Sequence, residues 1–123
     1  MPDFSFLLLH VDDHAASARF YHQLLELPIV DQKDDFAMLP LQDGVMLGLW
    51  AKATVEPAGA AQSGANEIAF TVADAATVEA THADWVRRGL TILQAPTQMS
   101  FGTTFVAVDP DGHRLRVFAP PAA

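Results

Sequence analysis

The sequence predicts an α+β protein built from two βαβββ modules, each with a cupped mixed sheet. Three observations support this prediction: a hairpin pattern that occurs twice, an order of elements that repeats at a constant offset, and one Pro/Gly/Ala-rich segment between the copies. The predicted modules are residues 1–52 and 66–119, joined by a linker at 53–65. The 123 residues are one domain's worth of sequence, enough to bury a sizeable core.

The two hairpins are centred on Asp-Gly turns. The later one, residues 101–120, places the turn 109–112 (DPDG) between two runs rich in β-branched and aromatic residues. Proline fixes one turn dihedral and glycine supplies a positive one, as a tight turn requires. The earlier one, residues 36–51, has its own Asp-Gly turn and carries Trp50 at the place of Phe118. In the later copy the arginines alternate with apolar residues, which predicts one core face and one polar face.

The first module opens with a continuous apolar run at residues 5–11, which is typical of a strand covered on both faces. Asp13 is then expected to cap a helix over residues 14–27. The apolar positions of this helix recur at i, i+4 and i+7, which predicts a core-facing stripe. That stripe consists of Phe20, Leu24 and Leu27.

The second module repeats this order 61 residues later. A strand at residues 66–73 leads to Asp74 as N-cap and to a helix over residues 75–88, which Gly89 ends. Trp85 is assigned to the packing of this helix on its sheet. Short strands are expected before the two hairpins, at residues 29–32 and 91–94.

Composition disfavours several classes of function. The chain has no cysteine, which removes thiolate nucleophiles and thiolate metal sites and agrees with a cytoplasmic location. Seven Lys and Arg against 15 Asp and Glu give a net charge of -8, so nucleic acid and anionic membrane surfaces are not expected as partners. The apolar run at residues 4–9 is too short for a membrane span and lacks the basic start of a signal peptide.

These elements, in this order, resemble the vicinal oxygen chelate superfamily: glyoxalase I, extradiol dioxygenases, and the bleomycin, fosfomycin and mitomycin resistance proteins. The resemblance covers essentially the whole chain. Its motifs are Phe20-Tyr21 in the first helix, the strand residues 69–72 (AFTV) and the turn 109–112. It implies that each module curls into a cupped sheet and that the pair of cups encloses a site whose metal ligands project from four strands.

By their spacing to these motifs, the four metal-ligand positions of the superfamily correspond to Phe6, Gly48, Glu67 and Arg116. Only Glu67 has a side chain that coordinates a divalent metal. Arg116 would place a positive charge where the metal would lie. The sequence therefore predicts no metal and no cofactor, and it disfavours glyoxalase, dioxygenase and metal-dependent thiol transferase activities.

The resemblance is greatest to the metal-free branch that binds flat antibiotics, and within it to the phenazine-antibiotic resistance members. Residues 101–105 (FGTTF) and 113–117 (HRLRV) are similar to their closing hairpin. The resemblance implies that Trp50 stacks on an aromatic ligand. The predicted function is metal-independent binding and sequestration of a planar hydrophobic or aromatic small molecule, with antibiotic resistance as one such role. A homodimer is expected, with the modules paired either within or between chains.

Most candidate ligand-binding residues are expected on the predicted cupped faces, whereas Phe101 is expected at a loop end, where it could close over a ligand or act as a buried anchor. Met46, Gly48 and Trp50 share one face of a strand, and the missing side chain of Gly48 is expected to leave room for a flat molecule. Other interpretations stay open: Trp50 as a core or dimer contact, Gly48 as the mark of a bulge, and the methionines as core fillers. The full candidate set is Trp50, Gly48, Met46, Met38, Phe6, Glu67, Phe101 and Arg116.

Glu67 and Arg116 are expected to face each other, and three roles fit them. They could form a structural ion pair, Arg116 could receive a ligand carboxylate, or the two could serve a metal-free lyase or isomerase as base and oxyanion partner. A binding protein is favoured over an enzyme, and a structural or regulatory module is a third option. Solvent-exposed or capping roles are expected for the remaining helix and turn histidines, His22, His82 and His113.

Overall fold

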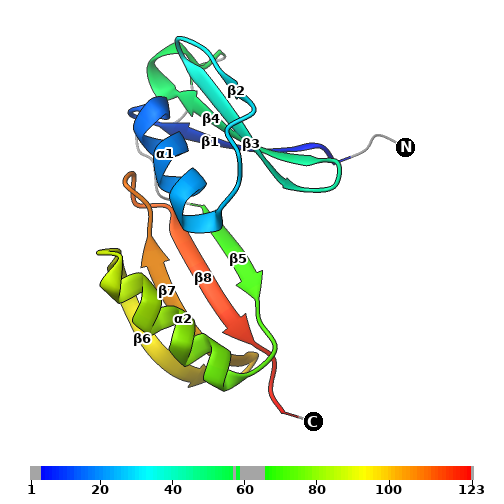
Figure 1. The fold of residues 1–123 in the computed structure, drawn as a ribbon, viewed down its shortest axis with the longest axis vertical. Helices are drawn as coiled ribbons and strands as arrows, with labels where there is room; N and C mark the ends of the chain where they lie inside the picture. Colours follow the sequence, from blue (N-terminus) through cyan, green and yellow to red (C-terminus); the bar gives the residue numbers. More distant parts are fainter. Residues whose placement is uncertain (1–3, 57, 59–65, 123) are drawn as a thin grey trace. The chain divides into compact units, whose positions relative to one another are not determined.

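The computed structural model describes residues 4–56, 58 and 66–122 (Figure 1). The chain forms two compact units, residues 1–63 and 64–123. Each unit has the order βαβββ and holds one four-stranded mixed sheet, so the predicted fold class is confirmed. Within the described ranges, no helix is long and apolar enough to cross a membrane.

The first module has the sheet order β1-β4-β3-β2, with β1 parallel to β4 and the other neighbours antiparallel. The predicted linker begins inside a structured turn, η1, and residues 57 and 59–65 of that linker lie outside the described part of the chain. The elements are β1 (Phe6–Val11), α1 (His14–Leu25), β2 (Asp31–Gln32), β3 (Phe36–Gln42), β4 (Val45–Ala51) and the 3₁₀ turn η1 (Lys52–Thr54).

Strand β1 is buried on one face only, so the expectation of a strand covered on both faces is wrong. Leu9 and Val11 are fully buried, whereas Phe6 and Leu8 are 43% and 42% exposed. An uninterrupted apolar run gives no alternation by which sequence could tell the two faces apart. The exposed face of β1 is the one that bears the candidate site.

Helix α1 begins as predicted, because the Asp13 carboxylate accepts a hydrogen bond of 3.1 Å from the Ala16 backbone N–H. It ends at Leu25, two residues earlier than predicted, where Glu26 adopts a left-handed conformation with φ of 56°. The predicted core stripe was also wrong in phase. The buried face consists of Ser17, Ala18 and Tyr21.

The phase of α1 has a packing explanation. Small side chains let a helix approach a sheet closely, and a single large ring can then fill the remaining volume. Ala18 and Tyr21 are fully buried in this way, and Phe20, at the edge of the contact, meets the Tyr21 ring edge-on at 5.0 Å. The prediction placed the larger apolar residues in the core because of their hydrophobicity alone. Of these, Phe20 and Leu24 are only half-buried.

The second module has the sheet order β5-β8-β7-β6, with β5 parallel to β8. Strand β6 continues five residues beyond its predicted end, because two register shifts against β7 accommodate the stretch that contains Pro96. The elements are β5 (Glu67–Thr71), α2 (Ala75–Arg87), β6 (Thr91–Met99), β7 (Gly102–Val108) and β8 (Arg114–Ala119).

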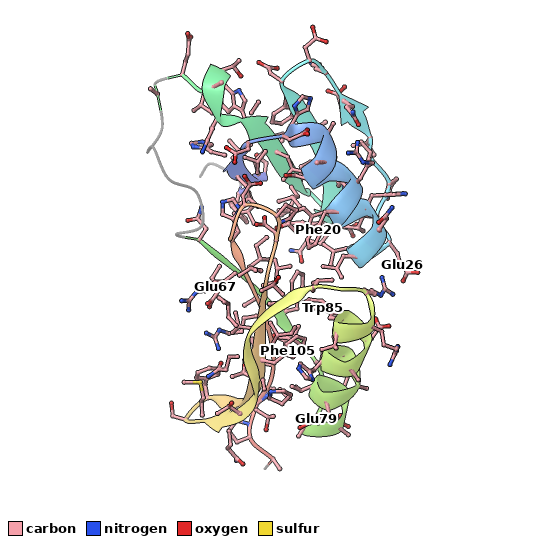
Figure 2. The ribbon with its side chains drawn as sticks, turned by 90° about the vertical axis from the view of Figure 1, so that its left-hand side faces the viewer. Phe20, Glu26, Glu67, Glu79, Trp85 and Phe105 are labelled. Atoms are coloured by element: carbon pink, nitrogen blue, oxygen red, sulfur yellow. The ribbon has the colours of Figure 1, made fainter. Side chains whose placement is uncertain are left out.

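Helix α2 lies along one face of this sheet (Figure 1). Asp74 caps it as predicted, accepting a hydrogen bond of 2.8 Å from the Thr77 backbone N–H. Trp85 is only 7% exposed, and its ring meets the rings of Phe70 and Phe105 at centroid distances of 6.5 and 5.3 Å. Trp85 and Phe105 lie between α2 and the sheet (Figure 2), so the assignment of Trp85 to helix–sheet packing is confirmed.

The turn between β7 and β8 encloses a buried polar pair. His113 and Asp109 are 1% and 4% exposed, and His113 Nδ1 lies 2.9 Å from Asp109 Oδ2. The other carboxylate oxygen accepts backbone N–H bonds from Asp111 and His113 at 2.9 and 2.8 Å. The expectation of a solvent-exposed or capping role for His113 was therefore wrong. The side chains of His113 and Asp109 are buried within the turn, and the sequence pattern of the turn does not reveal this burial.

Candidate functional site

The face of the first sheet opposite α1 is defined by strand alternation. Across β1 and β4, Phe6 pairs with Met46 and Leu8 with Gly48, so the side chains of each pair share a face. Strand β3 supplies the third member of each row. From one end to the other, the rows are Phe6–Met46–Pro40, Leu8–Gly48–Met38 and His10–Trp50–Phe36.

A pocket of about 370 Å³ opens on this module. Two predicted site residues, Phe6 and Trp50, line it. Met38, Met46 and Gly48 share the same sheet face but are not among the lining residues. The complete lining is Phe6, Leu8, Lys33, Asp35, Phe36 and Trp50.

Gly48 acts on this pocket through its neighbours. A Cβ atom at this position would lie 2.5 Å from Leu8 Cδ2 and 2.9 Å from Phe36 Cζ, closer than carbon atoms approach. The space over Gly48, which was expected to stay open for a flat molecule, is therefore filled by Leu8 and Phe36. These two side chains cross over the glycine and form part of the pocket wall.

Trp50 is held by contacts within the same module. Its indole N–H donates to the Thr54 hydroxyl at 3.2 Å, and that hydroxyl donates to the Ala51 carbonyl at 3.1 Å. The rings of His10 and Phe36 meet the indole nearly at right angles, with centroid distances of 6.3 and 6.5 Å. Trp50 is half-buried, so it presents a fixed aromatic surface to the pocket.

Sequence reasoning missed four of the lining residues. Leu8 and Phe36 were detectable, because each lies two residues from a chosen position, Phe6 or Met38, and so shares its face. Lys33 and Asp35 lie in the bend before β3. Nothing in the periodicity of a short loop indicates which of its side chains borders a pocket.

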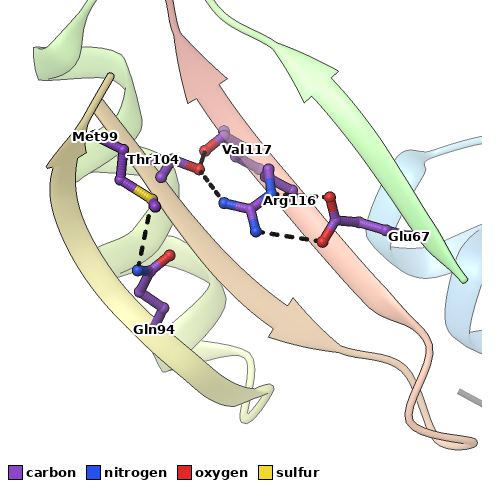
Figure 3. A network of polar contacts seen from close by, with 6 residues as sticks. All are labelled: Glu67, Gln94, Met99, Thr104, Arg116 and Val117. Carbon is purple, nitrogen blue, oxygen red and sulfur yellow. Dashed lines mark hydrogen bonds and ion pairs between the residues drawn. The ribbon is translucent and has the colours of Figure 1, made fainter. Parts of the chain in front are cut away.

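The predicted pair Glu67 and Arg116 forms a bidentate ion pair in the second module (Figure 3). Arg116 Nε donates to Glu67 Oε2 at 2.9 Å, and Nη2 donates to Oε1 at 3.3 Å. A third bond of 3.2 Å runs from Nη1 to the Thr104 hydroxyl, which itself donates to the Val117 carbonyl at 3.0 Å. The expectation that the two side chains face each other is confirmed.

Phe101 completes this second cluster. The Arg116 guanidinium carbon lies 5.6 Å from the Phe101 ring centroid, within range of a cation–π interaction. Phe118 meets the same ring edge-on at 5.9 Å. Beside this cluster, the Gln94 amide donates to the Met99 sulfur at 3.8 Å (Figure 3). The predicted site residues thus fall into two groups, one in each module, and Phe101 lies in the turn between β6 and β7.

The four superfamily metal positions do not fit a divalent cation. Phe6 and Gly48 offer no donor atom, and Arg116 is a cation that already engages both oxygens of Glu67. Among the residues that the structure describes, no group of three or more His, Cys, Asp or Glu side chains is placed to hold a metal ion.

The protein consists of two βαβββ modules, and in each module a helix covers one face of the sheet while candidate site residues lie on the other. This architecture defines a glyoxalase-like class of protein. The model of the Glyoxalase/Bleomycin resistance protein/Dioxygenase superfamily matches residues 4–117, and the chain belongs to this superfamily. The expected superfamily is therefore confirmed. A search of curated protein sequences gave no match.

Solved structures agree with this assignment. The chain is similar to protein ATC0852 from Agrobacterium tumefaciens, with 43% identity, a TM-score of 0.88, and coverage of 99% of this chain and 100% of that one. A glyoxalase/bleomycin resistance protein/dioxygenase from Nocardioides has 21% identity and a TM-score of 0.84, covering 100% and 89%. A glyoxalase-related enzyme from Fulvimarina pelagi has 21% identity and a TM-score of 0.82, covering 98% and 90%. The last two show the fold alone.

Proposed function

We propose that the protein binds and sequesters a planar hydrophobic or aromatic small molecule without a metal, in the pocket of the first module. The observation that supports this most is the fixed indole of Trp50 beside Phe6, Leu8 and Phe36. Pockets of a few hundred Å³ with mainly apolar walls are typical of small-molecule sites. A rigid ring offers a large stacking surface at little cost in side-chain entropy.

Membership of a superfamily that includes bleomycin resistance proteins supports a protective role for such binding. Sequestration of an antibiotic needs only affinity and a sufficient concentration of the protein. The resemblance of the closing hairpin to phenazine-resistance members makes phenazines the first compounds to test.

The test is a titration of phenazine and of menadione, a quinone, into protein dialysed against EDTA. The Trp85→Phe variant leaves Trp50 as the sole tryptophan, so a change in fluorescence then reports on the pocket. We expect saturable quenching with one ligand per pocket. Absence of saturable quenching with both compounds, or quenching that requires added zinc or nickel, would contradict the proposal.

The enzymatic alternative, a metal-free lyase or isomerase that uses Glu67 and Arg116, has weaker support. A general base needs a free lone pair within reach of the substrate proton. Each Glu67 oxygen already accepts a hydrogen bond from Arg116, and Glu67 is not among the residues that line the pocket of the first module. Turnover of a small carbonyl compound that Glu67→Gln abolishes, with folding intact, would favour the enzyme over the binding protein.

We also propose a homodimer. Phe4, Phe6 and Leu8 are large apolar side chains that stay exposed, and neighbouring exposed apolar residues of this kind often mark an interface. Light scattering at micromolar concentration is the test, and a monomeric mass would contradict the proposal.

A further inference from the structure

We infer that the pocket of the first module takes a planar aromatic cation, a compound whose ring system bears a protonated or quaternary nitrogen. The inference rests on the proposed function and adds the sign of the ligand charge. It comes from the aromatic walls, from one carboxylate at the pocket, and from the distribution of charge along the chain.

Three of the six lining residues are aromatic: Phe6, Phe36 and Trp50. The face of an aromatic ring is electrostatically negative and attracts cations, most strongly in the case of indole. Trp50 is already oriented by its bond to Thr54, so a ligand does not have to order it. These walls accept any flat apolar compound but favour one that is positively charged.

Asp35 supplies the matching negative charge. It is half-buried, lines the pocket and directly precedes Phe36. Over the part of the chain that the structure covers, its carboxylate has no hydrogen bond or ion pair. A cationic ligand stabilises a partly desolvated carboxylate most when the carboxylate has no counter-ion, because no existing ion pair has to be broken first.

Among the six residues that the structure places in the pocket lining, Lys33 is the one with a cationic side chain, and it would oppose such a ligand. Its ammonium group lies 3.6 Å from Asp31 Oδ2 and its side chain is 69% exposed. Solvent and the Asp31 carboxylate therefore screen its charge, whereas Asp35 is more buried. Residues 31–35 (DQKDD) together hold three carboxylates and one ammonium group.

The wider charge distribution has the same sign. Residues 1–63 contain nine of the 15 acidic residues but only three of the seven Lys and Arg. Most of the net charge of -8 thus belongs to the module that holds the pocket. A field of this sign raises the local concentration of cations and repels anions.

The test uses three tricyclic probes of one shape: N-methylacridinium, neutral acridine and acridine-9-carboxylate, titrated by calorimetry at mildly alkaline pH. We expect N-methylacridinium to bind tightest and acridine-9-carboxylate weakest. Asp35→Asn should weaken N-methylacridinium binding about fivefold or more and leave acridine within about twofold. Asp34→Asn is the matched control, since Asp34 is exposed, carries the same charge and does not line the pocket.

The possible outcomes separate this inference from the proposed function. Tighter binding of acridine-9-carboxylate, weakened by Lys33→Ala, would overturn it and identify an anion site at Lys33. Equal affinity for all three probes would overturn the charge preference while the proposed function stands. Equal losses in Asp35→Asn and Asp34→Asn would remove the specific role of Asp35, and no binding of any probe would overturn both proposals.

Discussion

The indole N–H of Trp50 donates a hydrogen bond of 3.2 Å to the hydroxyl of Thr54, four residues further along the chain. Strand β4 ends at Ala51 and the turn η1 follows directly, so this bond lies within one continuous local segment. The Thr54 hydroxyl donates in turn to the Ala51 carbonyl, which fixes the direction of its acceptor lone pairs. A local turn therefore sets the orientation of the largest ring in the pocket.

Thr54→Val removes the acceptor of the indole N–H but keeps the branched shape of the side chain. We expect ligand affinity to fall by up to about fivefold, in line with about 1 kcal/mol for a neutral hydrogen bond. Measured in the Trp85→Phe background, the Trp50 emission maximum should shift as well. Thr54→Ser restores the hydroxyl and should restore both quantities. Loss of affinity in Thr54→Ser equal to that in Thr54→Val would show that the methyl group matters rather than the hydrogen bond.

Gly48→Ala should change the pocket more than the fold. The new Cβ would meet the ends of the Leu8 and Phe36 side chains, which can rotate away, rather than backbone atoms. We expect a stability loss of about 1–3 kcal/mol, typical of overpacking, together with a change in ligand affinity. Urea unfolding and calorimetric titration measure the two effects.

The control for this change is the double variant Leu8→Ala with Gly48→Ala. Leu8→Ala removes the atom nearest to the new Cβ, so the two substitutions should be less destabilising together than the sum of the single variants. Strict additivity would mean that Leu8 does not respond to the added methyl group.

The elements that sequence predicted well are those with local causes. Asp13 and Asp74 were recognised as helix caps because one side chain satisfies a backbone N–H three residues away. The Asp-Gly turns were predicted because glycine tolerates the positive φ that a tight turn requires. In the structure, Gly44 and Gly112 adopt φ values of 78° and 87°. The internal repeat then extended these local signals to the whole topology.

The features that sequence missed depend on packing between distant segments. The phase of α1 follows from the fit of Ala18 and Tyr21 on the sheet, which a periodicity of apolar residues does not determine. Leu8 and Phe36 are 28 residues apart in sequence, and the ends of both side chains lie over Gly48 on the strand between theirs. Candidate site residues were chosen by superfamily position or by their predicted place on a strand face or loop, and four of the six lining residues were left out.

The buried pair of His113 and Asp109 predicts a pH dependence of stability. The hydrogen bond to Asp109 raises the pKa of His113 above its usual value of 6.5, although burial acts in the opposite direction. Because the folded state then binds this proton more tightly than the unfolded state does, the stabilising contribution is complete below about pH 6.5. It is lost as the pH rises through the raised pKa of the folded protein.

His113→Gln removes this titration. Urea unfolding over a pH series should therefore show that the stability advantage of the wild type over His113→Gln shrinks from about pH 6 to about pH 8. An advantage that stays constant or grows over this range would contradict the assigned direction of the pKa shift.

The two tryptophans should separate binding from folding. Trp85→Ala empties a site between α2 and its sheet, where Phe70 and Phe105 meet the indole ring. Such a truncation typically costs about 3–5 kcal/mol, because the surrounding side chains relax only partly into the cavity. Urea unfolding should show this loss directly.

Trp50→Ala should have the opposite profile. Trp50 is half-buried on the open face of the first sheet, so its truncation leaves little enclosed cavity but removes a stacking surface worth about 1 kcal/mol beyond its area burial. We expect phenazine affinity, measured by calorimetry, to fall about fivefold or more while the unfolding midpoint changes less than in Trp85→Ala. Trp85→Phe, which retains a ring in the core, is the matched control and should keep its affinity. Equal losses of stability in both alanine variants, with unchanged affinity in Trp50→Ala, would show that Trp50 is a packing residue and that the pocket binds nothing through it.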